Sequence, residues 1–208
     1  MPGAILTLKN KNKMALTICG EISANIVINC TYPLQAGTED TLILINRSDI
    51  ASTTRNGTDN EIIENIILAS GATGYIYQGV NNSHKPKFNI VKVGPFKRWS
   101  HQIDFLAFGV TSVEKKQMQK LKDGDIVAIV YNKFKGDTGK AAFEVYGFDS
   151  GLKLETLERA VTSQETQGAF AIGLMSDKDT GLEPFPPKSL FITSYAASLA
   201  VAEGLFTA

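Results

Sequence analysis

Two apolar and aromatic runs in the second half of the chain constrain the fold more than any other feature. They span residues 126–134 and 141–148, and six residues that include two glycines separate them, namely Lys135, Gly136, Asp137, Thr138, Gly139 and Lys140. Two strand-like runs joined by a short segment with glycine are typical of a β-hairpin. We therefore predict a long hairpin over residues 126–148.

Most of the remaining chain follows the two-residue period of β-strands. Apolar residues at even spacing predict a first strand over residues 16–30, with a bend at Gly20. Further strands are predicted around residues 41–45, 75–78, 88–93, 101–108, 152–161, 169–175 and 190–193. Residues 46–60 are rich in Ser, Thr, Asn, Asp and Gly and predict an exposed loop, whereas residues 61–69 fit either a helix or a strand.

Helical signals are confined to two places. Thr111 and Glu114 have the spacing of a capping box, which predicts an amphipathic helix near residues 112–122 that ends before Asp123-Gly124. The small residues of 195–205 predict a short C-terminal helix. The expected fold class is therefore mainly β (α+β), a single strand-rich domain that is a β-sandwich or barrel-like.

Domain organisation and charge give few further constraints. Residues 1–13 are polar and basic and are expected to form a flexible N-terminal arm, followed by one domain over residues 14–208. The 21 Lys and Arg residues balance the 21 Asp and Glu residues, so no overall field attracts the chain to nucleic acid or to a membrane. No segment approaches the roughly 18 consecutive apolar residues of a membrane span, and no export signal is expected.

No complete catalytic, metal or nucleotide motif is present. A phosphate-binding loop ending at Lys140 would need glycine where Phe134 stands and a hydroxyl where Ala141 stands. The only two histidines, His84 and His101, exclude a histidine-rich metal site, and the acidic residues near Glu183 do not match a calcium loop. We predict that the protein is not an enzyme and has no catalytic residue, metal or cofactor.

One cluster of basic and aromatic residues is a candidate contact surface. It comprises Lys92, Phe96, Lys97, Arg98, Trp99 and His101. Alternating cations and aromatic rings are suited to a polyanion. Trp, Arg and Phe also concentrate at the centres of protein interfaces, so a subunit interface is the other interpretation.

The chain resembles virion structural proteins of tailed bacteriophages, of the tail-tube and tail-completion type. The likeness lies in a strand-rich domain of this size with one helix, the hairpin at 126–148 and an N-terminal arm. The resemblance implies a homo-oligomeric ring, stacked on other rings around a lumen through which DNA passes without specific binding. It also implies contacts with other virion proteins, assembly in the host cytoplasm, location in the virion and an assembly role for the hairpin tip at 135–140.

Two other classes of function stay open. One is a different virion role, such as a connector, tail completion or capsid decoration. The other is a β-rich ligand- or carbohydrate-binding module, which would present an exposed aromatic platform such as Tyr75, Tyr77 or Trp99 and act as a monomer. An enzyme with an unusual site would instead show a pocket with converging polar groups.

Overall fold

The computed structural model describes residues 22, 24–80, 82–176 and 181–207. The internal contacts of the chain divide it into two units, residues 1–33 and residues 34–208. The second unit contains all the helices and strands of the described residues. The predicted arm, residues 1–13, lies outside the described residues.

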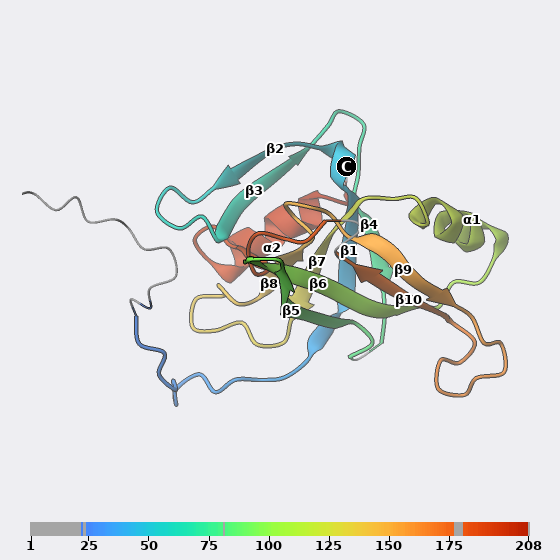
Figure 1. Cartoon of the computed structure of the whole chain (residues 1–208), viewed down its shortest axis with the longest axis horizontal. Helices are drawn as coiled ribbons and strands as arrows, with labels where there is room; N and C mark the ends of the chain where they lie inside the picture. Colours follow the sequence, from blue (N-terminus) through green and yellow to red (C-terminus); the bar gives the residue numbers. More distant parts are fainter. Residues whose placement is uncertain (1–21, 23, 81, 177–180, 208) are drawn as a thin grey trace, which may run out of the picture. The chain divides into compact units, whose positions relative to one another are not determined.

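Two β-sheets form the second unit within the described part of the chain (Figure 1). The seven-stranded sheet has the order β2-β3-β11-β8-β7-β1-β4, with strands Ile50–Arg55, Ile62–Leu68, Lys188–Leu190, Phe143–Tyr146, Ile126–Asn132, Thr38–Asn46 and Tyr75–Gln78. The four-stranded sheet has the order β5-β6-β10-β9, with strands Lys85–Val93, Phe96–Ala107, Phe170–Met175 and Lys153–Glu158. Neither sheet closes into a barrel, so each sheet ends in two edge strands.

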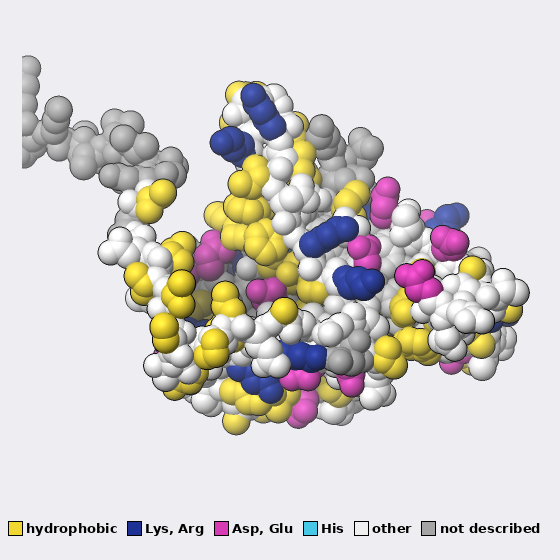
Figure 2. All heavy atoms as spheres, turned by 90° about the horizontal axis from the view of Figure 1, so that it is seen from below, with side chains coloured by type: hydrophobic (Ala, Val, Ile, Leu, Met, Phe, Trp, Pro, Cys, Tyr) yellow, Lys and Arg dark blue, Asp and Glu magenta, His cyan; other side chains and the backbone are white. Residues whose placement is uncertain are grey.

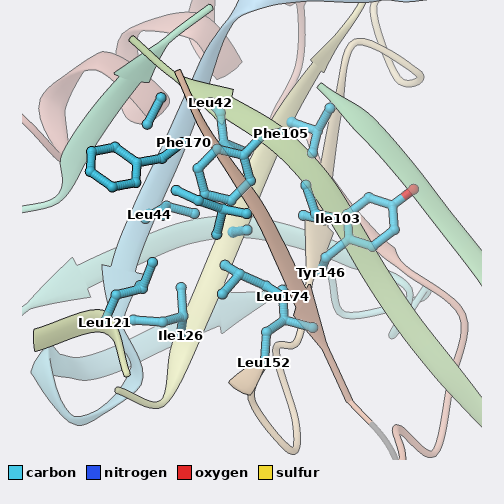
Figure 3. Packing of buried hydrophobic residues seen from close by; sticks show 14 of the residues in the cluster. Leu42, Leu44, Ile103, Phe105, Leu121, Ile126, Tyr146, Leu152, Phe170 and Leu174 are labelled. Atoms are coloured by element: carbon cyan, nitrogen blue, oxygen red, sulfur yellow. The ribbon is translucent and has the colours of Figure 1, made fainter. Parts of the chain in front are cut away.

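A first hydrophobic cluster lies between the two sheets (Figure 3). Leu42 and Leu44 of β1 point from the seven-stranded sheet toward Phe105 of β6 and Phe170 of β10. These side chains alternate along their strands with residues of the opposite face, as the pleat of a strand requires. The fold is therefore a β-sandwich, as one of the two predicted architectures proposed.

A second hydrophobic cluster covers the other face of the seven-stranded sheet. Ile43 and Ile45 of β1 and Phe143 of β8 pack there with Leu205, beside helix α2, Tyr195–Gly204. Because β1 and β7 are covered on both faces, their sequences are continuous apolar runs rather than alternating ones. The C-terminal helix predicted from small residues is confirmed.

Predictions that rest on strong local signals are confirmed. Strands β7 and β8 pair antiparallel with Ala128 opposite Tyr146, which is the predicted hairpin. Helix α1 spans Ser112–Leu121 and buries Met118 and Leu121. The ambiguous segment at 61–69 is strand β3, in agreement with its four β-branched isoleucines.

The loop predicted at residues 46–60 is wrong over much of its length. A 3-10 helix spans Arg47–Asp49, and strand β2 spans Ile50–Arg55 and pairs with β3. Its Ser and Thr side chains were interpreted as loop residues because they are polar. In an edge strand with mostly exposed faces, polar β-branched residues such as Thr53 and Thr54 are well suited.

The strand predicted at residues 16–30 is absent from the residues described there, which are 22 and 24–30. Residues 16–21 and 23 lie outside the described part. The two-residue period is present, but a strand also needs a neighbouring strand to satisfy its backbone groups. The described residues 22 and 24–33 contain no strand.

The capping box of α1 gives a direct test of local helix stability. The Thr111 hydroxyl accepts a hydrogen bond from the Val113 N–H at 3.3 Å, and the Thr111 N–H donates to the Glu114 carboxylate at 2.9 Å. We expect Thr111→Ala to lower the free energy of unfolding by about 1 kcal/mol, because the side-chain cap is lost. Chemical denaturation measures this, and Ser112→Ala at the exposed next position is the control. An equal loss in both variants would contradict the role of the cap.

Candidate functional site

The predicted basic and aromatic cluster lies on one hairpin, formed by β5 and β6 around the turn at Gly94-Pro95. Trp99 pairs with Ile90, Lys97 with Lys92, and Phe96 with Val93. Because paired residues share a face, Lys92, Lys97, Trp99 and His101 lie on the face that continues the core side of the sheet. Phe96 and Arg98 lie on the opposite face. The six residues therefore divide between two surfaces.

The core-side face of this hairpin carries exposed apolar side chains. Phe88 and Ile90 of β5 are 45% and 55% exposed, although they are on the same face as the buried Ile103. Phe88 contacts the half-buried Trp99, with ring centroids 5.6 Å apart. Sequence analysis found Trp99 but not Phe88 and Ile90, which look like ordinary core positions of a strand.

His101 belongs to the interior rather than to a contact surface. Its ring is buried, the Gly147 N–H donates to Nδ1 at 3.2 Å, and Nε2 lies 3.1 Å from the Phe185 carbonyl oxygen. Nδ1 is thus an acceptor, so Nε2 carries the proton and donates to Phe185. Burial lowers the pKa of His101 to about 4, although the Phe185 carbonyl opposes this shift. The side chain is neutral at pH 7 and cannot bind a polyanion.

Polar groups beside His101 are also satisfied within the chain. Glu183 is buried and accepts hydrogen bonds from the Asp149 and Ser150 N–H groups at 3.1 and 2.8 Å. Burial raises the pKa of its carboxyl group. The buried ammonium of Lys188 lies 3.7 Å from carboxylate oxygens of both Glu61 and Asp149. These contacts hold the residues around 183–188 against the sandwich and give each of the charged groups Glu183 and Lys188 a partner.

The two edges of the four-stranded sheet differ in charge. Strand β5 carries Lys85, Lys87 and Lys92 and no acidic residue. Strand β9 carries exposed Glu155 and Glu158, while its single cation, Lys153, lies 3.5 Å from Asp125. One edge is therefore basic and the other acidic.

The apolar patterns of the two edges match as well. Leu157 of β9 pairs with the core-facing Ile172 and is 40% exposed, so an apolar side chain lies on the core side of this edge too. Glu158 pairs with Ala171 and lies on the outer face, as do Lys85 and Lys87 on the other edge. If β5 and β9 of two copies were placed side by side, apolar residues would meet on one face and opposite charges on the other.

The outer face of the four-stranded sheet carries charges of both signs. Lys87 forms an ion pair with Asp104 at 3.2 Å, and the Gln102 amide donates to the same carboxylate at 2.9 Å. Gly173 at the centre leaves room for these groups, since a Cβ atom there would lie 2.5 Å from the Thr156 hydroxyl oxygen. This face offers no dense cluster of a single charge.

The predicted assembly tip, residues 135–140, packs against its own chain. The Lys135 ammonium lies 4.5 Å from the ring centroid of Tyr195 and 3.6 Å from Glu39. Lys140 lies 5.7 Å from the ring centroid of Phe191, and Gly139 is buried against Tyr195 with φ of +91°. Asp137 and Thr138 at the end of the loop are exposed, so the surface available for assembly is small.

A pocket of about 540 Å³ lies between edge strand β4 and helix α1. Its apolar lining includes Leu44, Tyr77 and Met118, and its polar lining includes Glu114 and Gln117. Tyr75 and Tyr77, predicted as an aromatic platform, both line it. Sequence analysis did not predict the pocket, because it depends on how α1 sits beside the sandwich.

No group of three His, Cys, Asp or Glu side chains suited to a metal ion occurs among the described residues. No described helix has the length and hydropathy needed to cross a membrane. Comparison with family models, with curated proteins and with solved structures found no match.

Proposed function

We propose that the protein is a structural subunit that assembles into rings by pairing β5 of one copy with β9 of the next. The opposite charges of these two edges are the observation that supports the proposal. The contact joins two different surfaces, so it is heterologous, and heterologous contacts form closed rings when the rotation between copies closes. Free strand edges readily pair with a strand of another chain.

The direction of the strands favours this contact. Neighbouring strands of the four-stranded sheet are all antiparallel, so β5 and β9 run in opposite directions. Copies related by rotation about an axis along the strands would therefore meet with β5 antiparallel to β9. The same antiparallel pattern would continue from one copy to the next around the ring.

The charges also disfavour the alternative contacts. Pairing β5 with a second β5 would bring lysines together, and pairing β9 with a second β9 would bring glutamates together. Like charges on opposite strands are destabilising. The lysines and Pro86 of β5, which protect an edge from indiscriminate pairing, are thus compatible with selective pairing to an acidic edge.

Such a ring would have the polar outer face of the four-stranded sheet toward its axis, because the core-side face is covered by the seven-stranded sheet. The ion pair between Lys87 and Asp104 offsets part of the positive charge of this face. A lumen with charges of both signs and no dense basic cluster suits the passage of DNA without tight binding, since affinity for DNA rises with the number of phosphates neutralised. We therefore propose a tail-tube-like subunit of a phage particle, assembled in the host cytoplasm.

Light scattering of the purified protein across a range of concentrations, combined with negative-stain imaging, tests the proposal. We expect closed rings, or tubes made from rings, with a mass that is a multiple of the chain mass and rises with concentration. A protein that stays monomeric at high concentration would contradict self-assembly.

The pocket beside β4 favours one alternative, a ligand-binding module. Its two tyrosines and its apolar floor are typical of small-molecule sites, which are concave and mostly apolar with a few polar groups. A monomer that binds a sugar or another small ligand in this pocket would support the module. Other virion roles would show assembly only on a partner protein.

A further inference from the structure

Residues 22–30 have the sequence of a half-buried strand, but the described residues among them, 22 and 24–30, form no strand. Even positions carry Ile22, Ala24, Ile26, Ile28 and Cys30, whereas odd positions are polar except for Val27. The side chains of Ile22, Ile26 and Ile28 are more than 90% exposed. In Figure 2 the described part of this segment, next to the grey atoms, shows yellow hydrophobic side chains among white atoms. Isoleucines in this arrangement lose the free energy that their burial would provide.

Strand β4 offers an edge that matches this segment. It is the last strand of its sheet, pairs with β1 among the described strands, and has the uncharged sequence Tyr75-Ile76-Tyr77-Gln78. The other edge strands differ, because β5 carries lysines, β9 carries glutamates and β2 has mostly exposed polar side chains. An uncharged edge without lysine or proline is the kind that pairs with an added strand.

The pocket lies on the side of β4 where an apolar face would be needed. Tyr75 and Tyr77 pair with the core-facing Leu44 and Leu42, so their side chains are on the inner face of the sheet. The pocket is lined there by Leu44, Met118 and Leu121. A strand added beside β4 would place its apolar residues over this lining and its asparagines toward solvent.

We propose that residues 22–30 form an added strand on the β4 edge of a second copy, with Ile26 and Ile28 covering the pocket between β4 and α1. Neither the segment nor the edge strand carries charge, and the charged groups of the pocket, Glu114 and Lys120, lie on or beside α1 rather than on β4. Residues 31–37 join the segment to β1, and seven extended residues reach about 23 Å, enough to approach a neighbouring molecule. This contact goes beyond the proposed ring, because it uses neither β5 nor β9.

Hydrogen exchange of the full chain at low and high concentration tests the proposal. We expect the amides of residues 22–30 and of 75–78 to become protected together, by about tenfold or more, as copies associate. Ile26→Asp with Ile28→Asp is expected to abolish both protections. Asn25→Asp with Asn29→Asp, which adds the same charge to the polar face, is the matched control and should retain them.

Three outcomes would overturn the proposal. They are unprotected β4 amides in the associated wild-type protein, equal effects of the two variants, and full protection already present in dilute monomer, which would mean docking within one chain. Replacing Glu155 and Glu158 of β9 by lysine removes the proposed ring contact but leaves the arm and β4 intact. If the amides of residues 22–30 and 75–78 stay protected together in this variant at high concentration, residues 22–30 dock on β4 even if the ring proposal fails.

Discussion

Copies that carry lysine in place of Glu155 and Glu158 are expected to associate about 30-fold more weakly than the wild-type protein at low salt. In the proposed contact these carboxylates meet the lysines of β5, and the substitutions turn attraction into repulsion at two places. Each reversed cross-strand pair changes the free energy of association by about 1 kcal/mol or more, and about 1.4 kcal/mol corresponds to a factor of ten. Light scattering at several salt concentrations measures the effect, which salt should reduce.

A charge swap makes this prediction specific to the two edges. Adding Lys85→Glu and Lys87→Glu to the same chain reverses the charges on the outer face of β5 to match the reversed β9, so we expect association to return to near the wild-type strength. Lys115→Glu with Lys116→Glu changes two exposed lysines of α1 and is the control for net charge. A swap variant that stays dissociated while its near-UV circular dichroism is native would contradict β5–β9 pairing.

Local sequence signals predicted the elements whose formation depends on neighbouring residues. The hairpin of β7 and β8 was predictable because a glycine-containing loop separates two apolar runs, and α1 because Thr111 and Glu114 satisfy its first N–H groups. Strand β2 was missed because its side chains are polar. They are polar because β2 is an edge strand, and its position in the sheet cannot be read from the sequence. The strand at 16–30 was predicted from its period, but the period gives no information about whether a partner strand is present.

Candidate surfaces were predicted less well than the fold. The cluster around Trp99 was identified by composition, but the pairing of β5 with β6 places Phe96 on the other face and His101 in the interior. The acidic edge of β9 was not recognised, because two glutamates in a strand are unremarkable until β9 is known to be the last strand. Residue types indicate which chemistry is present, whereas strand order determines which side chains share one exposed surface.

Acidification is expected to destabilise the fold through His101. Its pKa is about 4 in the folded protein and about 6.5 when unfolded, because burial disfavours the charged ring. The unfolded chain therefore binds more protons between these values, so stability is complete above about pH 6.5 and falls as the pH decreases toward 4. A shift of this size corresponds to about 3 kcal/mol in the free energy of unfolding. Protonation would also set an Nδ1–H against the Gly147 N–H.

Denaturation curves at pH 7 and at several values down to pH 4 measure this loss. Carboxylates also titrate in this pH range, and so does His84, because burial lowers its pKa as well. The informative quantity is therefore the difference in pH dependence between the wild-type protein and His101→Gln. The glutamine side chain is neutral throughout and retains a donor for the Phe185 carbonyl. We expect the variant to be less stable at pH 7 but to lose less stability on acidification. Parallel pH profiles for the two proteins would show that the pKa of His101 is the same in the folded and unfolded states, which would contradict a buried, neutral ring.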